Sequence, residues 1–313
     1  MHKYLVTGGA GFIGSHIVEK ILSLGNFVRV VDNFDTGSRE NLRGFTGNLE
    51  VVEGSVADWD LIRAATQGMD YVLHQAARGS VPRSVGDPLG THEANVTGTL
   101  CVLKAAHDAG VKRVVCAGSS SVYGETPVLP KEESMTPLPQ SPYAAGKLML
   151  EHYCAMFYKV YGLETVALRY FNIYGPRQNP DLQYAAVIPI FIKNMLQQKT
   201  CVIYGDGGQT RDFTYVEDCV RANLIACTHP AAAGQVINVA CGEQTSVLDL
   251  FLILKKMLDY DCSPSNEPSR AGDVRHSCGA VGKAMNCLDF RPAIRLQDGL
   301  AKSIDWYRKA LQP

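Results

Sequence analysis

The glycine-rich segment at residues 8–14 constrains the fold more than any other part of the chain. It has glycines at positions 8, 11 and 14, and it follows the apolar run Tyr4-Leu5-Val6. Glycines at this spacing let the backbone turn tightly from a strand into a helix and approach a pyrophosphate closely. The free N–H groups and the dipole at the start of that helix favour an anion. The segment therefore predicts a dinucleotide site between the first strand and the first helix.

A carboxylate stands where such a site needs one. Asp32 ends the second predicted strand, 18 residues after Gly14. A carboxylate at this place accepts hydrogen bonds from the ribose 2′-OH and repels a 2′-phosphate. The sequence therefore predicts NAD, rather than NADP, as the cofactor.

Short apolar runs alternate with helical patterns over the first 170 residues. The runs are continuous rather than alternating, which is typical of a parallel sheet covered on both faces. This order predicts an α/β fold with a Rossmann-type doubly wound parallel sheet. The predicted strands are at 4–7, 27–31, 49–53, 71–75, 113–117 and 164–169, and the predicted helices at 13–24, 94–109 and 142–161.

The regular alternation of apolar runs and helical patterns ends after residue 170, where Pro, Gly and Asn become frequent. Helical patterns return at 187–198, 216–228 and 247–258. We expect residues 1–170 to form the NAD-binding domain and residues 171–313 to form a smaller substrate-binding lobe, with the two parts interleaved.

Composition excludes several classes of function. The formal net charge of −1 provides no basic field for nucleic acid or an anionic membrane. No apolar run reaches the roughly 18 residues that a membrane span needs, and the first strand begins too early for a signal peptide. The ten cysteines form no C-x-x-C pair and the eight histidines no H-x-x-x-H pair, so we expect reduced thiols, no metal site and a cytoplasmic protein.

A second group of residues predicts proton transfer. Tyr143 and Lys147 are four positions apart on one face of a predicted helix, and Ser119 lies upstream. An ammonium near a phenol favours the phenolate, so we expect the pKa of Tyr143 to fall from its usual value of about 10. This arrangement is typical of a general base, a cation that tunes it and an orienting hydroxyl.

Motifs along nearly the whole chain resemble those of the extended short-chain dehydrogenase/reductases, and specifically the nucleotide-sugar 4-epimerases. These motifs lie at residues 7–14, 74–77, 95–99, 119–124, 142–147, 169–176, 211–218 and 270–277. The resemblance implies that Tyr143 takes the proton of the sugar 4-OH, that Lys147 holds the nicotinamide ribose and that Ser119 contacts the 4-oxygen. It also implies a homodimer formed through the helices at 94–109 and 142–161.

The resemblance extends to the binding residues. It implies that NAD contacts Gly8, Gly11, Phe12, Ile13, Gly14, Asp32, Asn33, Val56, Ala76, Ala77, Asn95, Tyr143, Lys147 and Tyr170. It implies that a UDP-sugar contacts Ser80, Ser119, Ser121, Asn172, Ala186, Val187, Tyr204, Arg211, Arg270, Asp273 and Ser277. Among these, Asn172, Arg211 and Arg270 would hold the diphosphate, which fits the bidentate recognition of phosphate by guanidinium groups. Arg211 has a second interpretation as a cap or ion-pair partner of Asp212 or Asp218.

The chain departs from the family pattern at a few positions. Ser55 stands where Asp is usual, which leaves its adenine contact open. Gly118 replaces a small polar residue, and Gly279-Ala280 replaces an Ala-Asp pair. Related dehydratases carry Asp-Glu directly after the catalytic hydroxyl, and related decarboxylases keep a Glu there. Ser120 and Ser121 occupy these positions, which argues against elimination and for oxidation followed by re-reduction.

One residue position indicates which UDP-sugar is the substrate. In similar epimerases, a bulky residue seven positions after the Arg of the R-x-G-D element excludes a 2-N-acetyl group. Here that position, counted from Arg270, is Ser277, so we expect UDP-N-acetylglucosamine and its galacto isomer as substrates. The alternatives are UDP-glucose or UDP-glucuronate 4-epimerases, a dehydratase or decarboxylase, and a non-catalytic dinucleotide sensor.

Overall fold

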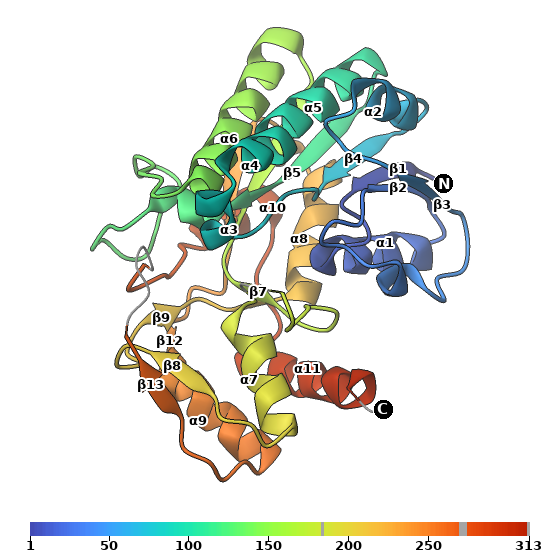
Figure 1. The fold of residues 1–313 in the computed structure, drawn as a ribbon. Coiled ribbons are helices and arrows are strands. Elements are labelled where there is room, and N and C mark those ends of the chain that lie inside the picture. The colour runs from blue at the N-terminus through green and yellow to red at the C-terminus, as the bar shows by residue number, and fades with distance from the viewer. Residues whose placement is uncertain (183–184, 269–273, 312–313) are drawn as a thin grey trace.

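A seven-stranded parallel sheet forms the centre of the molecule (Figure 1). The computed structural model describes residues 1–182, 185–268 and 274–311. The strand order is β11-β6-β5-β4-β1-β2-β3, so the chain winds outward in both directions from β1. The strands are β1 (Lys3–Thr7), β2 (Phe27–Asp32), β3 (Leu49–Glu53), β4 (Tyr71–His74), β5 (Arg113–Ser119), β6 (Glu164–Tyr170) and β11 (Gln235–Val239). The predicted doubly wound α/β fold is confirmed.

Helices cover both faces of this sheet. One face carries α2 (Trp59–Thr66), α5 (Gly98–Asp108) and α6 (Pro142–Tyr161), and the other carries α1 (Phe12–Ser23) and α8 (Val216–Thr228) (Figure 1). Neighbouring residues of a strand therefore enter different cores: Val6 packs with the α1 side and Leu5 with the α2 side. Because both faces are covered, the inner strands β1, β4, β5 and β6 are buried at nearly every position and are mostly apolar.

The second half of the chain forms a smaller lobe beside the sheet (Figure 1). In this lobe α7 packs between α9 and α11, next to short two-stranded pairs. Its elements are β7 (Ile173–Tyr174), α7 (Val187–Leu196), β8 (Val202–Tyr204), β9 (Thr210–Arg211), β10 (Thr214–Tyr215), β12 (Thr245–Ser246), α9 (Val247–Leu258), β13 (Ser265–Glu267) and α11 (Leu296–Ala310). Strand β11 and helices α8 and α10 (Gly282–Leu288) return to the sheet, so the 1–170 and 171–313 division remains a proposal with interleaved parts.

Several elements differ from the sequence prediction. The helix expected at 94–109 begins earlier, because the Asp87 carboxylate accepts from the N–H of Gly90 and caps α4 (Pro88–His92). Helix α4 continues through the π-helical turn Glu93–Thr97 into α5. Strand β3 is partly exposed because it is the edge of the sheet. The sequence analysis also omitted β11, α2, α3 (Val81–Gly86), α10 and α11. Short 3-10 turns complete the chain at Arg39–Leu42, Ser120–Tyr123 and Pro230–Ala232.

A buried ion pair ties α6 to the sheet. Nε and Nη2 of Arg169 on β6 donate to the two carboxylate oxygens of Glu151 on α6, each at 2.8 Å. The Arg169 guanidinium also lies over the ring of Tyr123, 4.6 Å from its centroid. The net stabilisation from a buried ion pair is small, but breaking one by removing a partner is costly. This contact therefore sets where α6 lies relative to the turn that follows β5.

Candidate active site

The glycine segment turns between β1 and α1 with no room for a side chain. Gly8 has φ +68°, and a Cβ there would lie 2.6 Å from the backbone nitrogen of Ala76. A Cβ on Gly14 would lie 2.1 Å from the carbonyl oxygen of Gly8. Gly11 precedes α1 without a side-chain cap, so the first N–H groups of the helix face the cavity. This cradle fits the pyrophosphate of a dinucleotide.

Asp32 lies at the carboxyl end of β2, beside the cradle. Its two carboxylate oxygens accept hydrogen bonds from the N–H groups of Ala10 (2.9 Å) and Phe34 (2.8 Å). Burial raises the pKa of Asp32 above its usual value, while these two hydrogen bonds act in the opposite direction. Since each oxygen keeps a second lone pair, the carboxylate can still accept from a ribose hydroxyl.

A cavity of about 900 Å³ opens at this edge of the sheet. Its lining includes every residue predicted to contact NAD except Asn95, namely Gly8, Gly11, Phe12, Ile13, Gly14, Asp32, Asn33, Val56, Ala76, Ala77, Tyr143, Lys147 and Tyr170. The Asn95 amide instead holds the backbone of Arg78, accepting from its N–H at 2.8 Å and donating to its carbonyl at 3.2 Å. Ser55 also lines the cavity, and its hydroxyl accepts from the N–H of Ala57 at 3.1 Å.

Tyr143 and Lys147 stand in the first turns of α6. Ser141 caps this helix by accepting from the N–H of Ala144, and Pro142 takes its first position. The Lys147 ammonium donates to the carbonyl of Ala117 at 2.7 Å and lies 5.9 Å from the centroid of the Tyr143 ring. Burial lowers the pKa of Lys147 from 10.5 to about 8. The hydrogen bond to Ala117 holds the lysine at a fixed position beside the phenol.

The prediction that the pKa of Tyr143 falls below its usual value is wrong for the protein without a bound cofactor. Burial raises the pKa of Tyr143, and only a hydrogen bond with Ser119 acts to lower it. The Lys147 ammonium donates to a carbonyl instead of the phenol, so its charge does not offset the loss of solvation. A cationic ring bound beside the phenol would lower this pKa, because it favours the phenolate.

The hydroxyl of Ser119 has a defined orientation. Ser119 ends β5 and follows Gly118, which lines the cavity. Its oxygen accepts from the hydroxyl of Ser121 at 2.9 Å and from the N–H of Ser121 at 3.2 Å. Because both acceptor positions are used, the hydroxyl hydrogen of Ser119 is left to donate. Ser121 thus orients Ser119 toward the phenol.

A second cavity of about 370 Å³ lies in the smaller lobe. It adjoins the first, since Ala185 and Ala186 line both. The predicted substrate residues Asn172, Ala186, Val187, Tyr204 and Arg211 line this second cavity, whereas Ser80 lines the first. Ser277 is placed next to them, because its N–H donates to the carbonyl of Thr210 at 3.1 Å. Arg270 and Asp273 lie outside the described residues.

The carboxylate beside Arg211, which the sequence offered only as a partner of that arginine, is buried and binds backbone N–H groups. Asp212 is fully buried and accepts from the N–H groups of Cys241 (2.8 Å), Gly242 (2.9 Å) and Gly279 (3.0 Å). Burial raises its pKa to about 6. The Asp212 side chain therefore joins its own segment to the segments at 241–242 and 279, next to the second cavity. The only signal in the sequence was an acidic residue between Arg211 and an apolar run.

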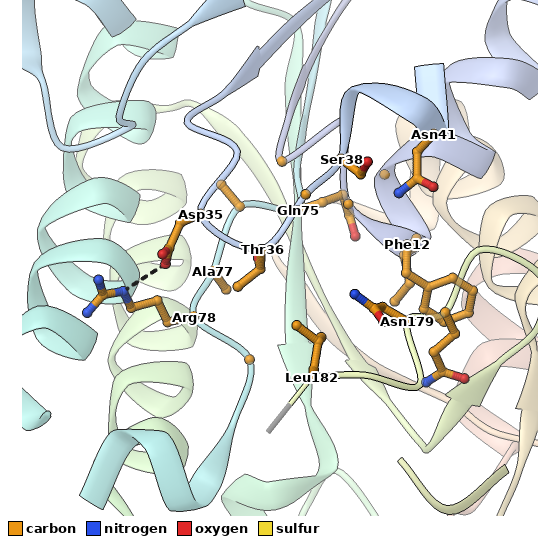
Figure 2. A pocket seen from close by; sticks show the side chains of 18 of the residues that line it. Phe12, Asp35, Thr36, Ser38, Asn41, Gln75, Ala77, Arg78, Asn179 and Leu182 are labelled. Carbon is orange, nitrogen blue, oxygen red and sulfur yellow. Dashed lines mark hydrogen bonds and ion pairs between the residues drawn. The ribbon is translucent and has the colours of Figure 1, made fainter. Parts of the chain in front are cut away.

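The sequence analysis also missed cavity residues on loops and on the last helix. Figure 2 shows Asp35, Thr36 and Arg78 at the cavity wall, with Asn179 and Leu182 nearby. Trp306 and Tyr307 of α11 line the same cavity. The loop residues follow β2 and β4, and the carboxyl ends of parallel strands meet at one edge. Nothing in the sequence indicated that α11 would reach this place.

Comparisons with known proteins agree with this geometry. The model of the NAD dependent epimerase/dehydratase family matches residues 4–240. The chain belongs to this family. A UDP-glucose 4-epimerase of Mycolicibacterium smegmatis is 38% identical over 314 residues, covering 99% of this chain and 100% of the relative.

Two solved structures are also very similar to this epimerase-family protein. UDP-glucose 4-epimerase of Thermotoga maritima, solved with UDP-glucose, has 39% identity and a TM-score of 0.95, and the match covers 99% of this chain and 100% of the other. UDP-N-acetylglucosamine 4-epimerase of Methanobrevibacter ruminantium, solved with UDP-N-acetylmuramic acid, has 38% identity and a TM-score of 0.95, covering 99% of each chain.

The family is NAD-dependent, and the glycine cradle and Asp32 provide a matching site for that cofactor. Within residues 1–182, 185–268 and 274–311, no group of three or more His, Cys, Asp or Glu is arranged to hold a metal ion. In the same ranges, no helix combines the length and apolarity that a bilayer crossing requires.

The glycine cradle can be tested by Gly14→Ala. The added Cβ would lie 2.1 Å from the Gly8 carbonyl oxygen, so the turn must open and NAD affinity should fall by about tenfold or more. The measurement is the amount of NAD that copurifies and the Kd for added NAD. Gly282→Ala is the control, because a Cβ there meets nothing within 4 Å. Equal NAD content in both variants would contradict the cradle.

The pKa of Lys147 predicts a pH dependence of stability. Burial lowers the pKa of Lys147 to about 8 in the folded protein, from 10.5 in the unfolded chain. Between these pH values the unfolded chain binds more protons than the folded protein, so the free energy of unfolding increases as the pH rises. Lys147→Met lacks this effect. The free energy of unfolding of the wild type, relative to Lys147→Met, should rise by about 3 kcal/mol from pH 7 to above pH 10. Urea titrations across this range measure it, and parallel curves would refute it.

Proposed function

We propose that this protein is a UDP-sugar 4-epimerase that interconverts UDP-N-acetylglucosamine and UDP-N-acetylgalactosamine with tightly bound NAD. The observation that carries the proposal is that Tyr143 and Lys147 line the NAD cavity and that Ser119, directly after the lining residue Gly118, hydrogen-bonds with Tyr143. A second cavity, lined by Asn172 and Arg211, adjoins the first. One cavity suits a dinucleotide, and its neighbour suits a nucleotide that carries a sugar.

The roles of the three side chains follow from their hydrogen bonds. Tyr143 removes the proton of the sugar 4-OH, and the Ser119 hydroxyl donates to the same oxygen. Lys147 is held by the Ala117 carbonyl and keeps a positive charge near the phenol below about pH 8. NAD, when bound, supplies the acceptor and donor of the C4 hydride. The centre is inverted if the hydride returns to the opposite face of C4 while the Tyr143 phenol gives the proton back to the 4-oxygen.

Inversion requires that the sugar turns while the nucleotide stays fixed. Arg211 and Asn172 lie in the second cavity, where a guanidinium can hold diphosphate oxygens. Asn172 is oriented by donating to the carbonyl of Asp212 at 3.0 Å. Asp212 in turn joins the segments at 241–242 and 279. These contacts hold the residues around the nucleotide in place, which suits a site that keeps the diphosphate fixed while the sugar turns.

Ser120 and Ser121 favour epimerisation over the lyase alternatives. Related dehydratases and decarboxylases carry one or two carboxyl groups directly after the catalytic hydroxyl, and in a dehydratase such a group removes a proton at C5 so that the 6-OH can leave. Ser121 donates to Ser119 instead, and a serine hydroxyl is a poor acid or base at neutral pH. A non-catalytic role is disfavoured because Tyr143, Lys147 and Ser119 are all present.

The choice of an N-acetylated sugar rests on Ser277. Ser277 lines neither cavity, but its N–H donates to the carbonyl of Thr210, the neighbour of Arg211 in the second cavity. A small residue at this position is what similar epimerases that accept a 2-N-acetyl group carry, and this supports the assignment. The two solved relatives differ in the sugar of their names at nearly equal identity, so overall similarity does not choose between them. UDP-glucose and UDP-glucuronate are the alternative substrates.

The test is conversion without added NAD, followed by proton NMR of the anomeric and H4 signals. We expect UDP-N-acetylglucosamine to give UDP-N-acetylgalactosamine, with activity lowered about a thousandfold or more in Tyr143→Phe because the base is lost. Tyr158→Phe, at an exposed position of the same helix, is the control. Turnover of UDP-glucose or UDP-glucuronate alone would refute the sugar assignment. No turnover of any of the three would refute the epimerase.

We also propose a homodimer formed through α4, α5 and α6. Large apolar side chains are exposed on these neighbouring helices, including Leu89, Leu100, Met149 and Val160. Large apolar side chains exposed on neighbouring helices are typical of an interface with a second copy of the chain. Light scattering should give twice the mass of one chain. Met149→Glu should shift the mass toward the monomer, whereas Leu252→Glu on α9 should not; a monomeric wild type would refute the dimer.

A further inference from the structure

Four charged side chains join the loops on either side of the NAD cavity. Asp35, on the loop after β2, pairs with Nε of Arg78 at 3.3 Å and with Nη2 of Arg83 at 3.0 Å. Arg78 follows β4, and Arg83 belongs to α3. Nη1 of Arg78 also pairs with Asp87, the N-cap of α4, at 2.6 Å. We call these four residues the Asp35 bridge.

The Asp35 bridge lies on the wall of the cavity. Asp35, Arg78 and Arg83 all line it, and Figure 2 shows the Asp35–Arg78 pair beside Thr36 and Ala77. Asp35 lies on the loop that follows Asp32, the predicted ribose ligand at the end of β2, whereas Arg78 follows Ala76 and Ala77 on the loop after β4. The bridge therefore connects the two segments between which a bound dinucleotide would lie.

Arg78 is held in position from two sides. The Asn95 amide binds both backbone polar groups of Arg78. The Asp87 carboxylate accepts from the Gly90 N–H at 2.9 Å as well as from the guanidinium. A Cβ on Gly90 would lie 2.2 Å from Nη1 of Arg78 and 2.3 Å from Oδ2 of Asp87. The absence of a side chain at position 90 thus leaves room for this pair.

We propose that the Asp35 bridge retains NAD in its site between the two hydride transfers. An enzyme that returns the hydride to the same carbon fails if the reduced cofactor leaves first, because the keto sugar then stays oxidised. The inference rests on the epimerase reaction proposed above. It assigns Asp35, Arg78 and Arg83 as positioning residues that act by holding two loops together around the cofactor.

The test is the rate at which bound NAD leaves, measured without any sugar by a chase with excess fluorescent etheno-NAD. Asp35→Asn should release NAD about tenfold faster, because two ion pairs of one network are lost. Release from the wild type should also accelerate between about 0.05 and 0.5 M salt, and less so from Asp35→Asn, since salt screens half-exposed pairs. Asp60→Asn is the control, because it removes an exposed pair with Arg63 on α2.

Gly90→Ala separates the bridge from a direct contact of Asp35 with NAD. Gly90 lies in α4 and does not line the cavity, but its Cβ would displace Arg78 and Asp87. Faster release in both Asp35→Asn and Gly90→Ala supports the bridge. Faster release in Asp35→Asn alone would overturn it in favour of direct binding. Unchanged release in both would overturn it outright. Because no sugar is present, this result is separate from whether the protein epimerises UDP-sugars.

Discussion

The close approach of three backbone segments at the carboxyl edge of the sheet underlies the whole site. Gly8 passes so near Ala76 that no side chain fits, and Gly14 passes as near to Gly8. This contact fixes the start of α1 against the end of β4. The other strands then deliver Asp32, Ser119 and Tyr170 to the same edge, because all seven strands run parallel. The cavity results from this geometry.

Buried polar contacts connect this edge to the elements that carry the chemistry. The Arg169–Glu151 pair ties α6, with Tyr143 and Lys147, to the strand next to Ser119. In the smaller lobe, Asp212 performs a similar task through three backbone N–H groups. Since unpaired buried charges are costly, such contacts permit few alternative arrangements. The distance between the two parts of the site is thereby restricted.

Burial also sets the protonation behaviour of Tyr143 and Lys147, the proposed catalytic pair. It lowers the pKa of Lys147 and raises that of Tyr143, so the charged form of each group is disfavoured before any ligand binds. The protein alone therefore holds the phenol neutral. A cationic cofactor ring would be the group that turns it into a base, which couples proton transfer to an occupied NAD site.

The sequence by itself determined the parallel sheet, the glycine turn and the placing of Tyr143 and Lys147, the proposed catalytic pair, on one helix. These features are local: continuous apolar runs, glycine spacing, and two residues one helical turn apart. Only the tertiary structure determined the contacts between segments that are far apart in the sequence. It brought Asp35 to Arg78, Asp212 to Gly279 and α11 to the NAD cavity. It also set the pKa of Tyr143, because desolvation depends on everything packed around a side chain and leaves no mark in the spacing of residues.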